Sequence, residues 1–352
     1  MTNIVNPYKN VDWTNVERVA SFNHVHGRSG NIQTLDDDYV TEYYFNKVYN
    51  YGFRHLPFSN YRPSTPSYPL IVKNENGELI TIPSDVIQCP NAEHVGINYM
   101  SANHFSGLGS TWSSGIVDDP TTEKVESDSG ANVSWKYAFD CILKNLQFED
   151  GGGIVINHPE WSKKTGGNLD LKLLKEFLDY DERVIGIEIY NACSSDPTNI
   201  WALDWWDNVL ITGRKVWGFC TCDWINAVTQ YIPLGRSVLL VNDKTEHDCL
   251  KAYRDGAFYG QIKNTSLKFK SIGLIGRNLL ITTENANYIN VIIDGNATQY
   301  NTNTVSITVP DDAVYVRAEA HSDDDSIFSN PIIFKPYRAM KNSITHKILT
   351  IL

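Results

Sequence analysis

Histidines and an aspartate stand at the ends of several short apolar runs in the sequence. His24 and His26 form a His-Val-His pair at the end of the first run, His158 ends GIVINH, and Asp223 directly follows VWGFCTC. Alternate residues of a strand point to the same side, so both imidazoles of the pair can meet one metal ion. Imidazoles and carboxylates are ligands of Zn, Mn and Fe. The pattern predicts a metal site if these strand ends meet in space.

A fourth region supplies an acid and another histidine, Glu93 in NAEHVGI and His104 in SANHFSGLGS. Any one such residue is ordinarily a polar side chain in a loop, but that explanation fits the whole set poorly. His94 is left out, because neighbours on a strand face opposite sides. His55 is interpreted as a core or surface histidine.

Up to about residue 262, apolar runs alternate with amphipathic segments. The expected strands are residues 19–25, 53–59, 153–158, 184–191 and 216–222, and the expected helices are 36–52, 134–147 and 170–180. Strand–helix alternation predicts an α/β fold with a parallel sheet or barrel. Ligands of such folds gather at the carboxyl ends of the strands, where the candidate residues lie.

From about residue 266 the pattern changes to short β-rich runs with turn signals such as Asp294-Gly295. No helical pattern interrupts them, which predicts a small all-β sandwich. We therefore expect three parts: a metal-binding unit over 1–265, the sandwich over 266–337 and a C-terminal tail over 338–352.

Composition narrows the class of protein. The 352 residues are 42% hydrophobic and carry a net charge of −11, which argues against nucleic acid as a partner. No run approaches the roughly 20 apolar residues of a membrane span, and the N-terminus lacks a signal-peptide pattern. The six cysteines are scattered, as expected for buried free thiols in a reducing compartment. These features favour a cytoplasmic protein that binds no membrane.

The order His-x-His, Glu, His, His-Pro and Asp resembles the PHP (polymerase and histidinol phosphatase) superfamily. GGGIVINHPEW, VIGIEIYNA, GRKVWGFCTCDW and LKAYRDGAFYG are similar to its strand and helix motifs, and AVYVRAEAHSDDDSIFSNPIIF resembles a β-rich segment that follows the barrel in some members. The resemblance implies a distorted (β/α)7 barrel followed by the β-sandwich, in a divergent member of the superfamily.

The resemblance also implies ligand sets for two metals. His24, His26, Glu93 and Asp223 would hold the first metal, and Glu93, His104 and His158 the second, with Glu93 bridging. The usual ligands of the family's third metal are missing, because their positions are occupied by Asn31, Tyr61 and Ile225. Because all losses fall on one site, the implied centre is binuclear, with two divalent ions (Zn, Mn or Fe).

The implied activity is that of a metal-dependent hydrolase, most simply a phosphoesterase acting on a small phosphate ester. Two metals can share a hydroxide and hold a phosphoryl oxygen. Glu93 and Asp223 are then the expected catalytic carboxylates. Arg28 and Arg54, with Arg62 beside them, are candidates for substrate phosphate, and Tyr61 is the third expected substrate-binding residue.

Two alternatives stay open. The loss of the third site also suits a catalytically weakened or inactive binding or scaffold protein, related to carbohydrate in one version, whose sandwich would dock a sugar or a protein. A binuclear hydrolase of a carboxylic ester or an amide is the other, since two metals serve that chemistry as well.

Overall fold

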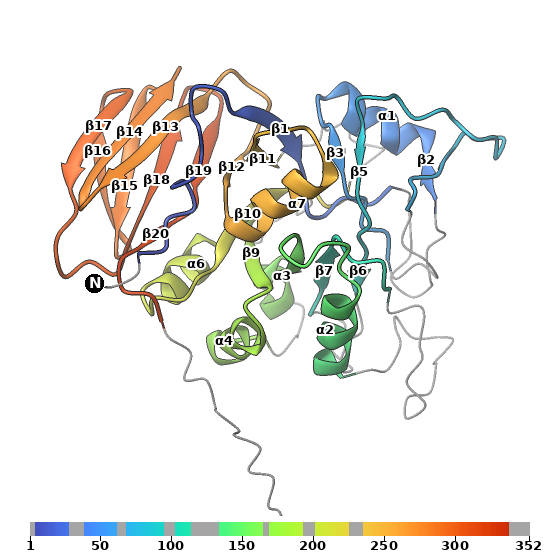
Figure 1. Cartoon of the computed structure of the whole chain (residues 1–352), viewed down its shortest axis with the longest axis horizontal. Helices are drawn as coiled ribbons and strands as arrows, with labels where there is room; N and C mark the ends of the chain where they lie inside the picture. Colours follow the sequence, from blue (N-terminus) through green and yellow to red (C-terminus); the bar gives the residue numbers. More distant parts are fainter. Residues whose placement is uncertain are drawn as a thin grey trace, which may run out of the picture.

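The computed structural model describes residues 4–27, 39–61, 68–94, 103–113, 134–164, 169–192, 201–224 and 235–337, without the side chains of 162–164. This part of the chain is a mixed α/β structure, as the sequence predicted, with many strands and few helices. In Figure 1 a β-sandwich fills one side of the molecule, and the helices and smaller sheets fill the other.

A large antiparallel sheet runs through both sides of the molecule. Its strand order is β1-β11-β12-β19-β18-β15-β16, and β20 pairs with β18. The strands are β1 (Glu17–Ser21), β11 (Arg236–Val241), β12 (Phe258–Gln261), β15 (Tyr288–Ile293), β16 (Asn296–Tyr300), β18 (Tyr315–His321), β19 (Ser326–Ser329) and β20 (Ile332–Ile333). Strands from the two ends of the chain therefore share one hydrogen-bonded ladder.

A five-stranded sheet carries most of the candidate residues. Its order is β10 (Trp217–Thr221), β9 (Val184–Asn191), β8 (Gly153–Ile156), β7 (Phe105–Leu108) and β6 (Glu93–His94). β8, β9 and β10 are parallel, and every residue of β9 is buried, as expected for a strand covered on both faces. Two short parallel pairs, β2 (Val40–Thr41) with β4 (Val72–Lys73) and β3 (His55–Leu56) with β5 (Ile87–Gln88), complete this side.

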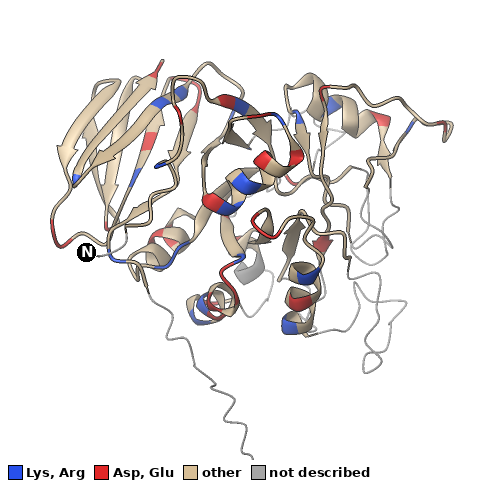
Figure 2. Cartoon of the chain, in the orientation of Figure 1, with Lys and Arg blue, Asp and Glu red and all other residues tan. Residues whose placement is uncertain are grey.

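The described helices are α1 (Glu42–Asn50), α2 (Trp135–Lys144), α3 (Pro159–Lys164), α4 (Leu171–Tyr180), α6 (Leu203–Leu210) and α7 (Glu246–Asp255). Three of them begin at side-chain caps: Ser134, Asp170 and Thr245 each accept a hydrogen bond from a backbone N–H of the first turn. None of these helices is long and apolar enough to cross a membrane. Figure 2 shows acidic and basic residues interspersed along α7.

Beyond residue 266 the structure contains the predicted strands. β13 (Lys268–Ile275), β14 (Asn278–Glu284) and β17 (Thr304–Thr308) form a second antiparallel sheet. It packs over β15 and β18, with Phe269, Ile281 and Val291 among the buried residues between them. The boundary near 265 itself stays a prediction, because the large sheet continues across it through the pairing of β12 with β19. Residues 338–352 lie outside the described residues.

The predicted distorted (β/α)7 barrel is not confirmed. β6, β7 and β8 pair in antiparallel fashion, and β1 pairs antiparallel with β11 rather than joining a parallel ring. Among the described residues, two single parallel bridges join these parts of the chain, Val25 with Asp223 and Tyr61 with Glu93. The chain beyond β1 is irregular, and backbone hydrogen bonds with Asp223 and from the N–H of Ser59 to the carbonyl of Val25 replace a continuous ladder there.

His55 lies in β3 and is fully buried, with its Nδ1 2.7 Å from Ser21 Oγ. This confirms its interpretation as a histidine outside the candidate site. Burial lowers the pKa of His55 to about 3, because a charged imidazolium loses its hydration in the core.

His55 should therefore make folding stability fall in mild acid. Below about pH 6.5 the His55 imidazole is protonated in the unfolded chain, whereas in the folded chain it stays neutral until about pH 3. The unfolding free energy therefore falls by about 1.4 kcal/mol for each pH unit in this range. From pH 7 to pH 5, the unfolding free energy should drop by about 2 kcal/mol more in the wild type than in His55→Gln. Urea titrations at both pH values measure the difference, and parallel pH dependences of the two proteins would contradict it.

Candidate metal centre

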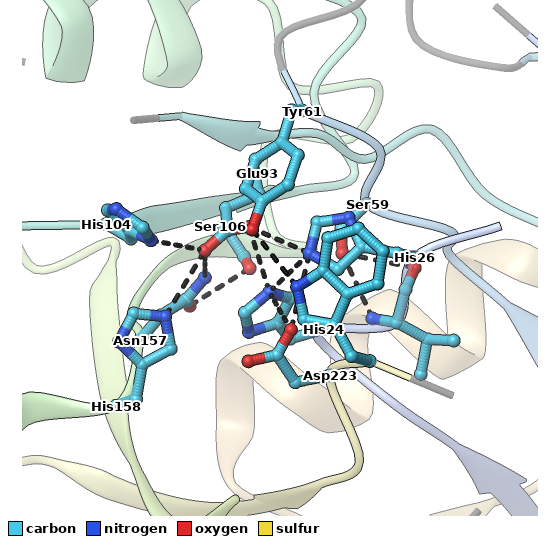
Figure 3. Close-up of polar contacts among 12 residues, drawn as sticks. His24, His26, Ser59, Tyr61, Glu93, His104, Ser106, Asn157, His158 and Asp223 are labelled. Carbon is cyan, nitrogen blue, oxygen red and sulfur yellow. Dashed lines mark hydrogen bonds and ion pairs between the residues drawn. The ribbon is translucent and has the colours of Figure 1, made fainter. Parts of the chain in front are cut away.

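Six side chains from separate parts of the chain converge at one place. They are His24, His26, Glu93, His104, His158 and Asp223, and all of them are buried. We call them the convergent cluster. Figure 3 shows Glu93 between His104 and His158 on one side and His24, His26 and Asp223 on the other.

Four ligand atoms of the convergent cluster form a compact tetrad. His24 Nε2 lies 3.1 Å from Glu93 Oε2, 3.2 Å from Asp223 Oδ1 and 3.3 Å from His26 Nε2. His26 Nε2 in turn lies 3.0 Å from Glu93 Oε2 and 3.3 Å from Asp223 Oδ1. Ligands about 2.1 Å from a tetrahedral metal are about 3.4 Å from one another. These are five of the six distances among the four atoms, and each fits two ligands of one small cation.

The hydrogen bonding of the tetrad also fits a cation. Glu93 Oε2 and Asp223 Oδ1 are buried, yet neither accepts a well-aligned hydrogen bond from a described residue. Buried carboxylate oxygens without such bonds are costly unless a positive charge faces them. A divalent ion in the tetrad would satisfy both oxygens together.

The other oxygen of Glu93 faces a second group. Glu93 Oε1 lies 2.8 Å from His104 Nδ1 and 3.3 Å from His158 Nε2. Asn157 donates to the same oxygen over 3.3 Å. Since the two oxygens of Glu93 belong to the two groups, this carboxylate connects them. His24, His158 and Asp223 also lie close enough together to form an alternative group of three ligands.

Glu188 is a central residue of the site that the sequence analysis missed. It lies inside β9, and its Oε1 accepts from Asn23 Nδ2 and lies 2.9 Å from His24 Nδ1. Its Oε2 accepts from the backbone N–H of His158 over 2.8 Å and from Asn191 over 3.0 Å. A carboxylate on Nδ1 fixes the tautomer that leaves Nε2 for a metal. The available signal was an acid in the middle of the apolar run VIGIEIYN.

Two members of the convergent cluster have unusual backbones. His158 has φ 26° and Asp223 has φ 53°, a left-handed region that is costly for residues with a Cβ. Neighbouring bonds hold both in place: Glu188 binds the N–H of His158, and Asp223 exchanges backbone bonds with His24 and His26. Such conformations persist where the surroundings over-determine them, often at functional sites.

Electrostatics in the convergent cluster favour the charged forms. Burial alone would raise the pKa of Glu93, but His24 and His104 hold it well below its usual range. Burial alone would lower the pKa of His24, but the carboxylates around it, Asp223 first, raise it well above the ordinary value. The carboxylates thus attract positive charge, and a metal ion that replaces imidazolium protons would release them.

Aromatic rings surround the convergent cluster. Tyr61 lies 4.2 Å from the His26 ring between centroids, and Trp224 stacks on His26 at 4.4 Å. Trp161 lies 4.9 Å from the ring of His158 and 5.2 Å from that of His104. Tyr61 therefore borders the site, while its binding of substrate stays a prediction.

Arg54, one of the predicted phosphate-binding arginines, makes its described contacts with residues outside the convergent cluster. Arg54 forms an ion pair with Asp85 at 2.7 Å, donates to the carbonyls of Tyr49 and Phe53, and lies over the Tyr49 ring. It would have to leave these partners to contact a substrate. Arg28, Arg62, Asn31 and Ile225 lie outside the described residues.

The cysteines of the described chain do not contribute to the site. Cys89, Cys220, Cys222 and Cys249 are buried free thiols, as the sequence predicted, whereas the free thiol of Cys141 is half-buried and Cys193 lies outside the described residues. Burial raises the pKa of Cys220 and Cys222, so both remain protonated. The Cys-x-Cys pair is core packing.

Comparisons with known proteins give limited information. No family model matches the chain, and no curated protein matches it. Among solved structures, the chain is similar to a two-domain protein from Bacteroides vulgatus described as containing a predicted PHP-like metal-dependent phosphoesterase. The match covers 96% of this chain and 92% of that chain, at 11% sequence identity and a TM-score of 0.44. Likeness at this level establishes neither a shared fold nor a shared activity.

Proposed function

We propose that this chain is a metal-dependent hydrolase with a binuclear centre, and that its substrate is a small phosphate ester. The observation that carries the proposal is the placement of Glu93, whose two oxygens face two separate groups of ligand atoms. His24, His26, Glu93 and Asp223 would hold one ion, and Glu93, His104 and His158 the other. The donors are imidazoles and carboxylates, which suits Zn, Mn or Fe.

Two bound ions would supply an activated water and a Lewis acid for the phosphoryl oxygen. Neighbouring side chains of this chain orient the candidate metal ligands. Glu188 holds His24 and the backbone of His158, and Asn191 bridges Glu188 and Asp223 with bonds of 3.0 and 3.1 Å. Asn157 holds Glu93 and accepts a bond from Ser106. These bonds fix the carboxylates before any substrate arrives, so little reorganisation opposes the reaction.

Metal analysis tests the proposal directly. Protein purified without chelator should contain close to two divalent ions per chain by elemental analysis, and it should hydrolyse a generic aryl phosphate. Chelation should abolish hydrolysis and lower the melting temperature, because an ion bound to the folded state alone stabilises it. One ion or none per chain would contradict the binuclear centre. Two ions without turnover of phosphate, carboxylic ester or amide substrates would favour the binding or scaffold alternative.

A further inference from the structure

A different tryptophan lies at each end of the convergent cluster. Trp224 follows Asp223 and stacks on His26 with an interplanar angle of 22°. Its Nε1 donates to Tyr61 Oη over 3.1 Å, which fixes the orientation of the indole. The ring therefore stands at the end of the site that the tetrad occupies.

Trp161 stands at the other end. It lies in the first turn of α3, three residues after His158, and its ring is tilted against His104 by 51° and His158 by 78°. Glu93 lies between the two ends, because Oε2 faces His26 and Oε1 faces His104 and His158. One indole thus adjoins each group of ligand atoms.

The indole side chains differ from the candidate ligands in their exposure to solvent. All members of the convergent cluster are buried, whereas Trp161 and Trp224 are both partly exposed. A molecule whose reacting group reaches the cluster would therefore have indole surface beside the rest of it. Among the described side chains that also bond the cluster are the amides Asn157 and Asn191 and the carboxylate Glu188. The carboxylate of Glu188 would repel a negatively charged organic group on the substrate.

We propose that the organic group of the substrate carries a flat aromatic ring, which stacks on Trp161 or Trp224 while the phosphoryl group meets the metals. The inference rests on the proposed phosphoesterase function and narrows its substrate class. Aromatic pairs gain from offset stacking or edge-to-face contact beyond their buried area. That gain corresponds to a preference of about tenfold for an aromatic ring over a saturated ring of similar size.

Three phosphonates that cannot be hydrolysed separate ring recognition from turnover. Methylphosphonate, cyclohexylphosphonate and phenylphosphonate are titrated calorimetrically into the metal-loaded protein and into the chelated protein. We expect all three to bind only the metal-loaded protein, with phenylphosphonate about tenfold tighter than cyclohexylphosphonate.

Leucine variants locate the stacking surface. Trp161→Leu and Trp224→Leu keep an apolar side chain but remove the ring, so in at least one variant the ratio of the phenylphosphonate to the cyclohexylphosphonate affinity should fall to about one. Trp201→Leu is the matched control, since Trp201 packs on Tyr190 and Phe328 instead. Metal content and melting temperature of each variant confirm that it is folded and loaded.

The outcomes are distinct. Methylphosphonate binding with equal affinities for the phenyl and cyclohexyl compounds would overturn the aromatic-ring inference and leave the phosphoesterase proposal standing. A phenyl preference that survives in both leucine variants and in their double variant would also overturn it. Failure of all three phosphonates to bind metal-loaded protein would overturn both proposals.

Discussion

Glu93→Gln is expected to empty both metal positions together. The substitution removes the charge of the carboxylate whose two oxygens face both groups of ligand atoms. Metal affinity should fall at least about 100-fold at both positions, since even partners outside the ligand shell contribute 10–100-fold. Bound metal should drop from about two ions per chain to well below one, hydrolysis should disappear, and the stabilisation conferred by metal should be lost.

Asp223→Asn is the matched control for that result. Asp223 Oδ1 contacts His24 and His26, so its loss should weaken mainly the tetrad and leave about one ion per chain. Elemental analysis and calorimetric titration with Zn²⁺ or Mn²⁺ distinguish the two variants, and near-ultraviolet circular dichroism verifies their packing. Equal metal content in Glu93→Gln and in the wild type would show that Glu93 does not bridge.

Glu188→Gln should weaken metal binding about 10–100-fold, although Glu188 is placed outside the proposed ligand sets. The carboxylate accepts a hydrogen bond from Nδ1–H of His24, which makes Nε2 a stronger metal ligand. It also accepts from the backbone N–H of His158. A glutamine in its place keeps the volume but carries no charge. Competition titrations with a coloured chelator measure the loss. Hydrolysis at saturating metal should recover in large part, because the ligands themselves remain.

Glu319→Gln provides the comparison for Glu188. Glu319 is a mostly buried glutamate in β18 that pairs with Arg317 and lies near His321. Its loss should affect stability and leave metal affinity unchanged. Wild-type metal affinity in Glu188→Gln, or an equal loss in Glu319→Gln, would show that Glu188 has a merely structural role.

Much of the candidate site could be predicted from the sequence because strand ends are local signals. An apolar run followed by His158 or Asp223 reveals both the strand and the residue at its carboxyl end. Glu188 was missed because attention to strand ends ignores an acid within a strand, and its partners Asn23, His24 and Asn191 become neighbours only through folding. The roles of Arg28 and Tyr61 in substrate binding stay predictions.

The fold was harder to predict from the sequence than the candidate site was. A continuous apolar run predicted Val184–Asn191 in β9, and short β-rich runs predicted later strands such as Asn278–Glu284 in β14. Pairing direction was not readable, because the partner of a strand is set by distant contacts: β1 pairs with β11, more than 200 residues away. The barrel expectation failed where β6, β7 and β8 run antiparallel.

The continuous ladder from β1 to β16 has an evolutionary consequence. A gene ending near residue 265 would encode a protein whose β12 lacks β19 and presents an open sheet edge, a surface prone to aggregation. It would also lack Arg317, whose guanidinium binds Asp207 of α6 with two bonds of 2.8 Å. Recombination that exchanged the sandwich alone would have to rebuild that pairing and that ion pair at once. The two halves are therefore expected to be inherited and to diverge together.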